Sequence, residues 1–363
     1  MKPVFTYVPG KGATEFFAAA SGASESAFSS GAHFYHEELA YSVAHGASLA
    51  GAAGFAFLKS HGVAKAMNAV IASLYAGTGA PFVVLAFEDA AGRSSDHPFS
   101  AFPMLQSVGA RVLRAEAGKI VEAARRAFDE SLSMRKPVFI AIEVSEIAEE
   151  EPRTVREVLD ELVAQAQSRF EPAERYRALL NPLLSGRYFQ PLARIPSCPA
   201  DLPPHLKMWA ERYEPVIEVL EELGHEWVTG DAGTSSLFGL PPHDFIDVCT
   251  HMGGAVPLAI GAALGGVERV LAVAGDFSFI STGNLALTEA LRRGVGLDVV
   301  IFRNREASAT GGQMVGKKEL FRQIPEGVWS TEVDCNQQGF QAKIRDFLAG
   351  PPQFGARVLI AGF

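Results

Sequence analysis

The sequence predicts an α/β protein made of two halves of similar size, each a mostly parallel sheet with helices on both faces. Three observations support this fold class. Continuous apolar, β-branched runs alternate with segments of helical spacing, which is typical of parallel strands covered on both sides. The 363 residues are enough for about two domains. A charged and proline-containing stretch, residues 151–204, separates the halves and is interpreted as a linker.

The first half, residues 1–150, supplies the clearer strands. We expect strands over 53–58, 81–87, 110–114 and 137–144, and helices over 63–76 and 118–133. The runs PFVVLAF and PVFIAIEV show no polar alternation, as expected for strands buried on both faces. In the charged stretch that follows, Thr154 and Glu157 predict a capping box on a surface helix.

The second half, residues 205–363, repeats this alternation without repeating the sequence. We expect strands over 226–230, 269–274, 297–302 and 356–360, with helices over 283–293 and 338–348. The two halves are therefore predicted to share a fold type and not a sequence repeat.

Composition argues against several classes of function. The net charge of −9 disfavours nucleic acid as a partner, since such proteins present a basic face. The longest apolar run, residues 255–267, contains Pro257 and is shorter than the ~20 residues of a membrane span. The start of the chain has no apolar leader pattern, and the three cysteines have no CxxC spacing. We expect a cytoplasmic enzyme with no iron–sulfur cluster in this chain.

Polar residues follow two consecutive strands of the second half. Asp276 comes directly after the strand that ends in Ala274-Gly275, and Asn304 comes after the next strand. The carboxyl ends of parallel strands share one edge, where ligands bind. Carboxylate and amide oxygens suit Mg²⁺, while Gly275 and a helix expected to begin near Ser281 suit a phosphate group. The same pattern is expected if Asp276 is an Asp at the end of a strand and Asn304 an Asn in a turn, and neither binds a ligand.

Further motifs make the pattern more specific. The Gly-Asp pair and the later Asn resemble the metal–diphosphate motif of thiamine diphosphate (ThDP) enzymes. Residues 304–313 read NREASATGGQ, and VTGDAG, GLPP and HMGG stand at 228–233, 239–242 and 251–254. With these motifs the chain resembles the α subunit of indolepyruvate ferredoxin oxidoreductase, in the 2-oxo acid:ferredoxin oxidoreductase family, over about 40–150 and 205–320. The resemblance implies a pyrimidine-binding (Pyr-like) domain over 1–150 and a diphosphate-binding (PP-like) domain over 205–363.

The resemblance also implies a set of ligands. Asp276, Asn304 and the main-chain carbonyl of Glu306 would hold Mg²⁺. Val256 would be the hydrophobe that bends the cofactor. The residues in contact with ThDP would be Asp231, Gly233, Thr234, Met252, Gly253, Val256, Gly275, Phe277, Ser278 and Thr310, with Asp231, Gly233 and Thr234 under its rings.

The first half carries a candidate for the glutamate that activates ThDP. The family has N-E-x-x-A followed by G-A-S-L-A-G, and this chain has His36-Glu37-Glu38-Leu39-Ala40 followed by GASLAG at 46–51. The resemblance therefore implies Glu37 as the activating carboxylate, with His36 as a substrate contact and His61 as a steering or proton-relay group. Two glutamates that stabilise a helix N-terminus would look the same.

The family oxidises 2-oxo acids and passes the electrons to iron–sulfur clusters held by a cysteine-rich domain, whereas this chain has three scattered cysteines. This departure favours a ThDP- and Mg²⁺-dependent decarboxylase or carboligase with no redox step, acting on an aryl pyruvate such as indolepyruvate. A homodimer with active sites shared between chains is implied. Two alternatives stay open: an oxidoreductase subunit with an external iron–sulfur partner, and a non-catalytic binding module.

Overall fold

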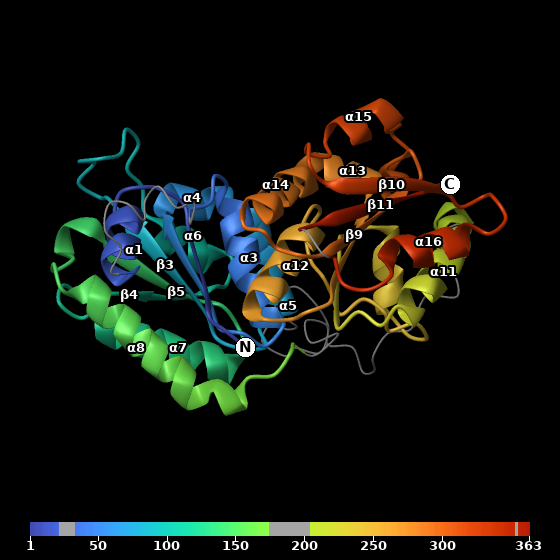
Figure 1. The fold of residues 1–363 in the computed structure, drawn as a ribbon. Coiled ribbons are helices and arrows are strands. Elements are labelled where there is room, and N and C mark those ends of the chain that lie inside the picture. The colour runs from blue at the N-terminus through green and yellow to red at the C-terminus, as the bar shows by residue number, and fades with distance from the viewer. Residues whose placement is uncertain (22–32, 174–203, 353–354) are drawn as a thin grey trace. The chain divides into compact units, whose positions relative to one another are not determined.

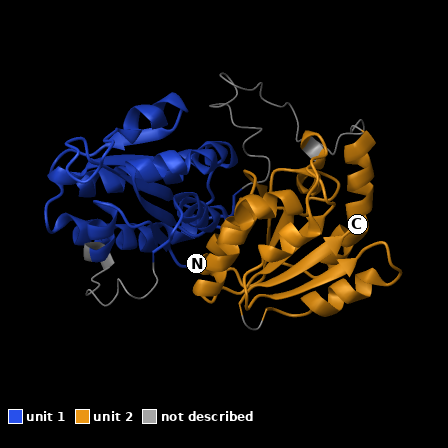
Figure 2. Ribbon diagram, turned by 90° about the horizontal axis from the view of Figure 1, so that it is seen from above, with its two compact units in different colours: residues 1–178 blue, residues 179–363 orange. Residues whose placement is uncertain are grey.

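The computed structural model describes residues 1–21, 33–173, 204–352 and 355–363 (Figure 1). The chain divides into two compact units, residues 1–178 and 179–363 (Figure 2). Each unit has one parallel sheet with its own buried core, so the predicted α/β fold class is confirmed. Among the described helices, none is long and apolar enough to cross a membrane.

The described sheet of the first unit has five strands in the order β1-β2-β3-β5-β4, and all neighbours are parallel. The strands are β1 (Val4–Tyr7), β2 (Gly54–Lys59), β3 (Phe82–Glu88), β4 (Arg111–Arg114) and β5 (Val138–Glu143). The central strand β3 is buried along its whole length, as its apolar run predicts.

Helices cover both faces of this sheet. They are α1 (Ala13–Ser21), α3 (Glu37–Leu49), α4 (Ser60–Lys65), α5 (Met67–Ala76), α6 (Ala101–Ser107), α7 (Ile120–Met134) and α8 (Glu151–Ala166), with short turns η1 (Val144–Glu146) and η2 (Gln167–Arg169). On one face, α1, α7 and α8 share a core with Val83 and Val138. On the other, Tyr41 of α3 contacts Phe82 and Phe139, because successive strand residues point to opposite faces. The helix predicted over 63–76 is two helices that meet at Ala66, where the backbone leaves helical geometry.

The segment predicted as a linker begins as part of the first unit. Helix α8 buries Val155 and Leu159 in the same core as α1 and α7, so this unit extends past the boundary predicted at residue 150. The predicted capping box is wrong, because α8 already begins at Glu151. Thr154 lies inside the helix and donates a hydrogen bond to the Glu150 carbonyl. The rest of the predicted linker, 174–203, lies outside the described residues.

The described sheet of the second unit has six strands in the order β10-β11-β9-β8-β6-β7, and all neighbours are parallel. The strands are β6 (Trp227–Gly230), β7 (Val248–Cys249), β8 (Val270–Gly275), β9 (Asp298–Arg303), β10 (Trp329–Asp334) and β11 (Arg357–Gly362). The four strands predicted for this half are confirmed as β6, β8, β9 and β11. The edge strand β10 and the two-residue β7 were not predicted.

The helices of the second unit are α11 (Pro204–Glu222), α12 (Ala255–Gly265), α13 (Asp276–Ser278), α14 (Asn284–Arg292), α15 (Lys317–Arg322) and α16 (Phe340–Leu348), with η3 (Thr234–Gly239), η4 (Phe279–Gly283) and η5 (Ser308–Thr310). The helices predicted over 283–293 and 338–348 are confirmed as α14 and α16. Elements α13, η4 and α14 follow without a break, so the helical run starts at Asp276 and not near Ser281 as predicted. Segment η4 is a π-helical turn, a feature frequent at functional sites.

Three neighbouring strands of the second sheet end at one edge. Strands β9, β8 and β6 lie side by side, and the chain leaves them at Asn304, Asp276 and Asp231. In a parallel sheet the carboxyl edge is where ligands bind. The fold therefore places three of the predicted site residues at the edge where chemistry is expected.

Candidate functional site

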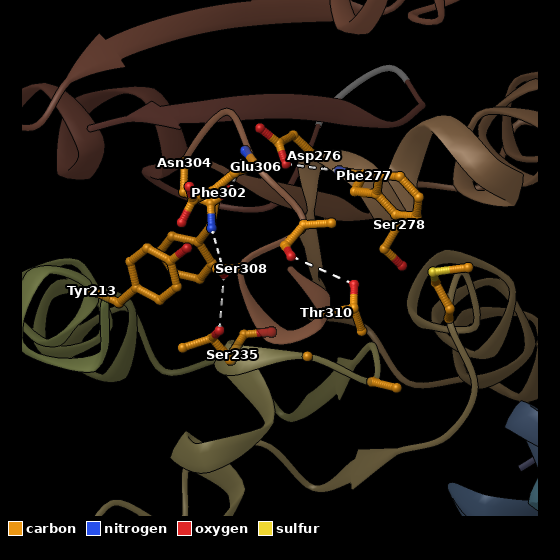
Figure 3. Close-up of a pocket in the computed structure, with 16 residues that line it drawn as sticks. Tyr213, Ser235, Asp276, Phe277, Ser278, Phe302, Asn304, Glu306, Ser308 and Thr310 are labelled. Carbon is orange, nitrogen blue, oxygen red and sulfur yellow. Dashed lines mark hydrogen bonds between the residues drawn. The ribbon is translucent and has the colours of Figure 1, made fainter. Parts of the chain in front are cut away.

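A pocket opens at the carboxyl edge of the second sheet (Figure 3). Its wall comes from the ends of β8 and β9, the loop 304–310, η3 and helix α11. The predicted residues that line it are Gly233, Thr234, Met252, Gly275, Asp276, Phe277, Ser278, Asn304, Glu306 and Thr310. The structure thus gathers most of the predicted cofactor and metal residues around one pocket.

Asp276 is the buried acid of this pocket. It opens the helical run after β8, and its two carboxylate oxygens accept hydrogen bonds of 2.8 Å from the backbone N–H groups of Phe277 and Arg305. Burial raises the pKa of Asp276 to about 6, while these two bonds and the charge of Arg303 act in the opposite direction. No Lys or Arg within the described residues forms an ion pair with this carboxylate.

Asn304 shapes the loop that follows β9. Its Oδ1 accepts a hydrogen bond from the Glu306 N–H at 3.2 Å, and its Nδ2 donates to Ser308 Oγ at 3.0 Å. Arg305, which lies between them, has a φ of +68°. This left-handed conformation is uncommon for a residue other than glycine and marks a tight turn. The loop is closed by an isolated bridge between Glu306 and Met314. Asn304 and the Glu306 backbone therefore have a defined position beside Asp276.

Asp231 lies behind the pocket and not in its wall. Its Oδ2 accepts a hydrogen bond of 2.5 Å from Ser278 Oγ, and its Oδ1 accepts one of 2.7 Å from the Ala255 N–H. Ser278 Oγ in turn accepts the Gly253 N–H at 2.8 Å. Burial raises the pKa of Asp231 to about 6. Asp231 therefore ties β6, α12 and α13 together, and its predicted position under the cofactor rings stays a prediction.

Two more predicted residues stand away from the pocket wall. Val256, expected to bend the cofactor, is 1% exposed in the first turn of α12. Gly253 has a φ of +84°, and a Cβ there would lie 1.4 Å from Thr282 Oγ1. Gly253 is therefore needed for the close approach of its loop to η4, which leaves Met252 as the residue of this loop that lines the pocket.

Several lining residues were not among the predicted contacts. Tyr213 of α11 lies with its ring stacked on Phe302, their centroids 4.4 Å apart. Burial and the charge of Asp276 raise the pKa of Tyr213, and an interaction with the Asn304 side chain acts in the opposite direction. The other missed lining residues are Ala232, Ser235, Phe302, Ala307 and Ser308. Tyr213 comes from a helix that no motif marks, so only the tertiary fold brings it here.

In the first unit, the candidate catalytic residues lie at the carboxyl side of the sheet. Glu37 is the first residue of α3, and its carboxylate lies 2.7 Å from Lys65 Nζ of α4, as an ion pair without an aligned hydrogen bond. His36 precedes it, with Nδ1 buried and without a hydrogen-bond partner among the described residues. Burial and the nearby Lys65 charge lower the pKa of His36. His61 in the first turn of α4 is exposed, with its ring edge on Phe99 at 4.8 Å.

The family comparison assigns the pocket to a known type of domain. Residues 231–341 match the family model described as "Thiamine pyrophosphate enzyme, C-terminal TPP binding domain". All the lining residues named above except Tyr213 fall in this range. The chain has the fold of a ThDP-dependent enzyme. No curated protein sequence matches it.

Solved structures agree with this fold over nearly the whole chain. A putative thiamin diphosphate-dependent enzyme from Mycobacterium smegmatis has 16% identity and a TM-score of 0.60, with 99% of this chain and 96% of that chain covered. Benzoylformate decarboxylase from Polynucleobacter necessarius has 13% identity and a TM-score of 0.60, with 99% and 95% covered. A thiamine diphosphate-dependent 4-hydroxybenzoylformate decarboxylase from Rhodococcus jostii RHA1 has 14% identity and a TM-score of 0.63, with 99% and 95% covered. At these identities the likeness establishes the fold of this chain.

The pocket has the features that the diphosphate of ThDP requires. Gly233 and Gly275 line the pocket, and a Cβ added at either position would have no atom within 4 Å. A side chain at these positions would therefore occupy space that glycine leaves open to a ligand. Beside Gly275 lies the N-terminus of the helical run from Asp276, which favours a phosphate, although the Phe277 N–H already bonds to the Asp276 carboxylate. These residues fit a diphosphate group.

The donor set also fits Mg²⁺. It consists of the Asp276 carboxylate, the Asn304 amide and the Glu306 main chain, all hard oxygen donors at one pocket. The bridge to Met314 is made by the backbone of Arg305 and Ala307, which leaves the Glu306 carbonyl without a backbone donor among the described residues. The described residues contain no cluster of three or more His, Cys, Asp or Glu side chains that could hold a metal. A cation that takes other ligands from water and phosphate suits this set.

Proposed function

We propose that this protein is a ThDP- and Mg²⁺-dependent enzyme that decarboxylates a 2-oxo acid without redox chemistry. In the decarboxylase outcome, R–CO–COO⁻ and one proton give R–CHO and CO₂. In the carboligase outcome, the carbon that loses CO₂ attacks a second carbonyl compound and gives an acyloin-type product. The observation that carries the proposal is the match to the TPP-binding domain over the residues that line a pocket with one buried carboxylate.

Asp276, Asn304 and the Glu306 carbonyl would hold Mg²⁺, and Gly275 with the first turn after it would hold the diphosphate. Bound ThDP supplies an electron sink for the electron pair that remains when CO₂ departs. The protein's part is to hold the cofactor rigidly and to exclude water. The hydrogen bonds between Asp231, Ser278 and Gly253 support that rigidity from behind the pocket.

Glu37 would activate the cofactor by a hydrogen bond from its carboxyl group to the aminopyrimidine ring, as the sequence resemblance implies. The position of Glu37 supports this role. Its carboxylate lies at the N-terminus of α3 and beside the charged Lys65. The resemblance pairs the Glu-bearing domain of one chain with the cofactor domain of a second chain. A homodimer with shared active sites is therefore part of the proposal.

The proposed substrate is a 2-oxo acid with an aromatic group. The resemblance suggests indolepyruvate, and two of the similar structures are named as decarboxylases of benzoylformate and 4-hydroxybenzoylformate. Phe277 and Met252 line the pocket and are 43% and 42% exposed, so they offer apolar surface to a flat ring.

The test is CO₂ release from indolepyruvate, phenylpyruvate, benzoylformate and aliphatic 2-oxo acids, with ThDP and Mg²⁺, without coenzyme A and without an electron acceptor. We expect steady turnover of an aromatic substrate, with an aldehyde or a coupled ketone identified by mass. Absence of CO₂ from every acid, under conditions in which ThDP is bound, would contradict the proposal.

A second candidate is the catalytic subunit of a 2-oxo acid:ferredoxin oxidoreductase. The run NREASATGGQ at 304–313 favours it, because the resemblance to that family rests on this motif. This reading requires an external iron–sulfur partner. It predicts that CO₂ release from the purified chain depends on an added electron acceptor and on coenzyme A, which the first proposal does not.

A further inference from the structure

Helix α11 holds the predicted metal loop with two side chains that stand one turn apart. Trp209 and Tyr213 are at positions i and i+4 of α11, so they lie on the same face of the helix. Trp209 Nε1 donates a hydrogen bond of 2.8 Å to Glu306 Oε1. Tyr213 lines the pocket together with Asn304, and its hydroxyl interacts with the Asn304 side chain. One helix face therefore reaches both residues of the loop that are predicted to hold the metal.

The two aromatic side chains are themselves fixed. Trp209 is 6% exposed and Tyr213 is 2% exposed. The Tyr213 ring stacks on Phe302 at 4.4 Å and packs on Phe363 at 4.9 Å, and Trp209 packs edge-on to Phe363 at 6.2 Å. Phe302 belongs to β9, the strand that leads into Asn304. The aromatic cluster thus fixes α11 to the strand that carries the loop.

The contacts act on the orientation of the loop, and Trp209 bonds to the side chain of Glu306 and not to its carbonyl. The predicted ligand from Glu306 is its main-chain carbonyl, so the Glu306 side chain is available to Trp209, and this bond fixes how the residue is turned. The Asn304 amide is oriented by its hydrogen bonds with Ser308 and with the Glu306 N–H, and Tyr213 lines the pocket beside it. Groups that orient metal ligands change metal affinity by roughly 10–100-fold when they are removed.

We propose that Trp209 and Tyr213 are positioning residues that set the Mg²⁺ affinity of this site by holding Asn304 and Glu306 in place. This inference rests on the proposed function, because it assumes that Mg²⁺ binds with ThDP at Asp276. Neither side chain is among the predicted ligands.

The test is ThDP binding by titration calorimetry at a series of Mg²⁺ concentrations. Trp209→Phe keeps a ring and removes the N–H, and Tyr213→Phe removes the hydroxyl alone. We expect each variant to need roughly 10–100-fold more Mg²⁺ for half-maximal ThDP binding, and to bind ThDP at saturating Mg²⁺ like the wild type. Glu306→Ala should need the same Mg²⁺ concentration as Trp209→Phe, because both substitutions remove the same hydrogen bond. The double variant should need no more Mg²⁺ than either single variant.

Matched controls separate positioning from stability. Trp329→Phe changes a tryptophan of the same unit that is 61% exposed. Tyr41→Phe removes a buried hydroxyl that shares a 2.6 Å hydrogen bond with Ser73 in the first unit. Both should keep the wild-type Mg²⁺ dependence, even though the second lowers the melting temperature.

The outcomes also separate this inference from the proposed function. Wild-type Mg²⁺ dependence in folded Trp209→Phe or Tyr213→Phe overturns the inference and leaves the function standing. Loss of ThDP capacity that Mg²⁺ does not restore also overturns it, because the residues would then be structural. A wild-type protein that binds no ThDP at any Mg²⁺ concentration overturns the proposed function itself.

Discussion

Ser278 donates a 2.5 Å hydrogen bond to Asp231, and this bond joins the carboxyl ends of two neighbouring strands, β6 and β8. The same serine accepts the Gly253 N–H, and the same carboxylate accepts the Ala255 N–H at the start of α12. Three loops that meet at the pocket are therefore held by one buried acid that does not line it. No described residue forms an ion pair with Asp231, and a buried carboxylate without such a partner costs free energy. The ionisation of Asp231 should therefore make the stability depend on pH.

We expect the stability of the second unit to fall between about pH 4 and 6 because of Asp231. Its pKa is about 6 in the folded chain and ~3.9 when unfolded, so in this range the folded chain keeps a proton that the unfolded chain has lost. Raising the pH therefore disfavours folding until the pH passes about 6. The effect of a two-unit shift is on the order of 2–3 kcal/mol at most.

Asp231→Asn should remove this part of the pH dependence. The measurement is urea unfolding followed by tryptophan fluorescence, because Trp209, Trp227 and Trp329, the three tryptophans of the chain, all lie in the second unit. The difference in unfolding free energy, wild type minus variant, should decrease as the pH rises through this window. If the unfolding free energies of the two proteins change with pH in parallel, the pKa of Asp231 is not raised in the folded chain.

Asp276→Ala should lose Mg²⁺-dependent ThDP binding while the second unit stays folded. The variant lacks the one carboxylate of the predicted metal site and the acceptor for the N–H groups of Phe277 and Arg305. Calorimetry should show a loss of affinity of at least about 100-fold, in line with the removal of a metal ligand. Asp334→Ala, at an exposed Asp of the same unit, is the control. Unchanged ThDP affinity in Asp276→Ala would remove Asp276 from the metal site.

Glu37→Gln should bind ThDP and turn over substrate at least about 100-fold more slowly, because the amide cannot exchange a proton with the cofactor. The measurements are kcat for CO₂ release, which should fall, and the ThDP dissociation constant, which should stay close to that of the wild type. Glu149→Gln, at an exposed glutamate of the same unit, should behave as wild type. Full activity in Glu37→Gln would show that the activating carboxylate is another residue.

Mixing the two inactive variants tests the shared site of the proposed homodimer. If Glu37 of one chain serves the cofactor of the other, a dimer of Glu37→Gln with Asp276→Ala contains one intact site and one with both changes. Random pairing after joint refolding should then restore about a quarter of the wild-type activity. Mixtures that stay as inactive as their parents would place both residues in the site of a single chain, or in none.

The central strands of each sheet were predictable, because a strand that is buried on both faces has a continuous apolar sequence. The run FVVLAF became β3, the central strand of its sheet. By contrast, β10 has the sequence WSTEVD and is largely exposed at the sheet edge, so its composition is that of a loop. Helix α11 went unpredicted, and Pro215 inside it is a residue that normally interrupts helices.

The site was predictable where it follows strand ends. Asp276 and Asn304 come directly after β8 and β9, so their meeting at one edge follows from the parallel sheet. Tyr213 and Trp209 have no such relation to the motif, because a helix far upstream brings them to the loop through tertiary packing. Asp231 was found by its motif, but its hydrogen bonds to Ser278 and to the Ala255 N–H could not be predicted, since they depend on how three loops pack together.

ThDP binding to the wild-type chain, measured with Mg²⁺ and then with excess chelator, shows directly whether Asp276 and Asn304 form a metal–diphosphate site. Calorimetry should show saturable binding with Mg²⁺, and the loss of that binding with chelator, because a carboxylate and a diphosphate repel each other unless a cation neutralises their charges. No binding in the presence of Mg²⁺, or binding that the chelator leaves unchanged, would contradict a metal–diphosphate site at Asp276 and Asn304.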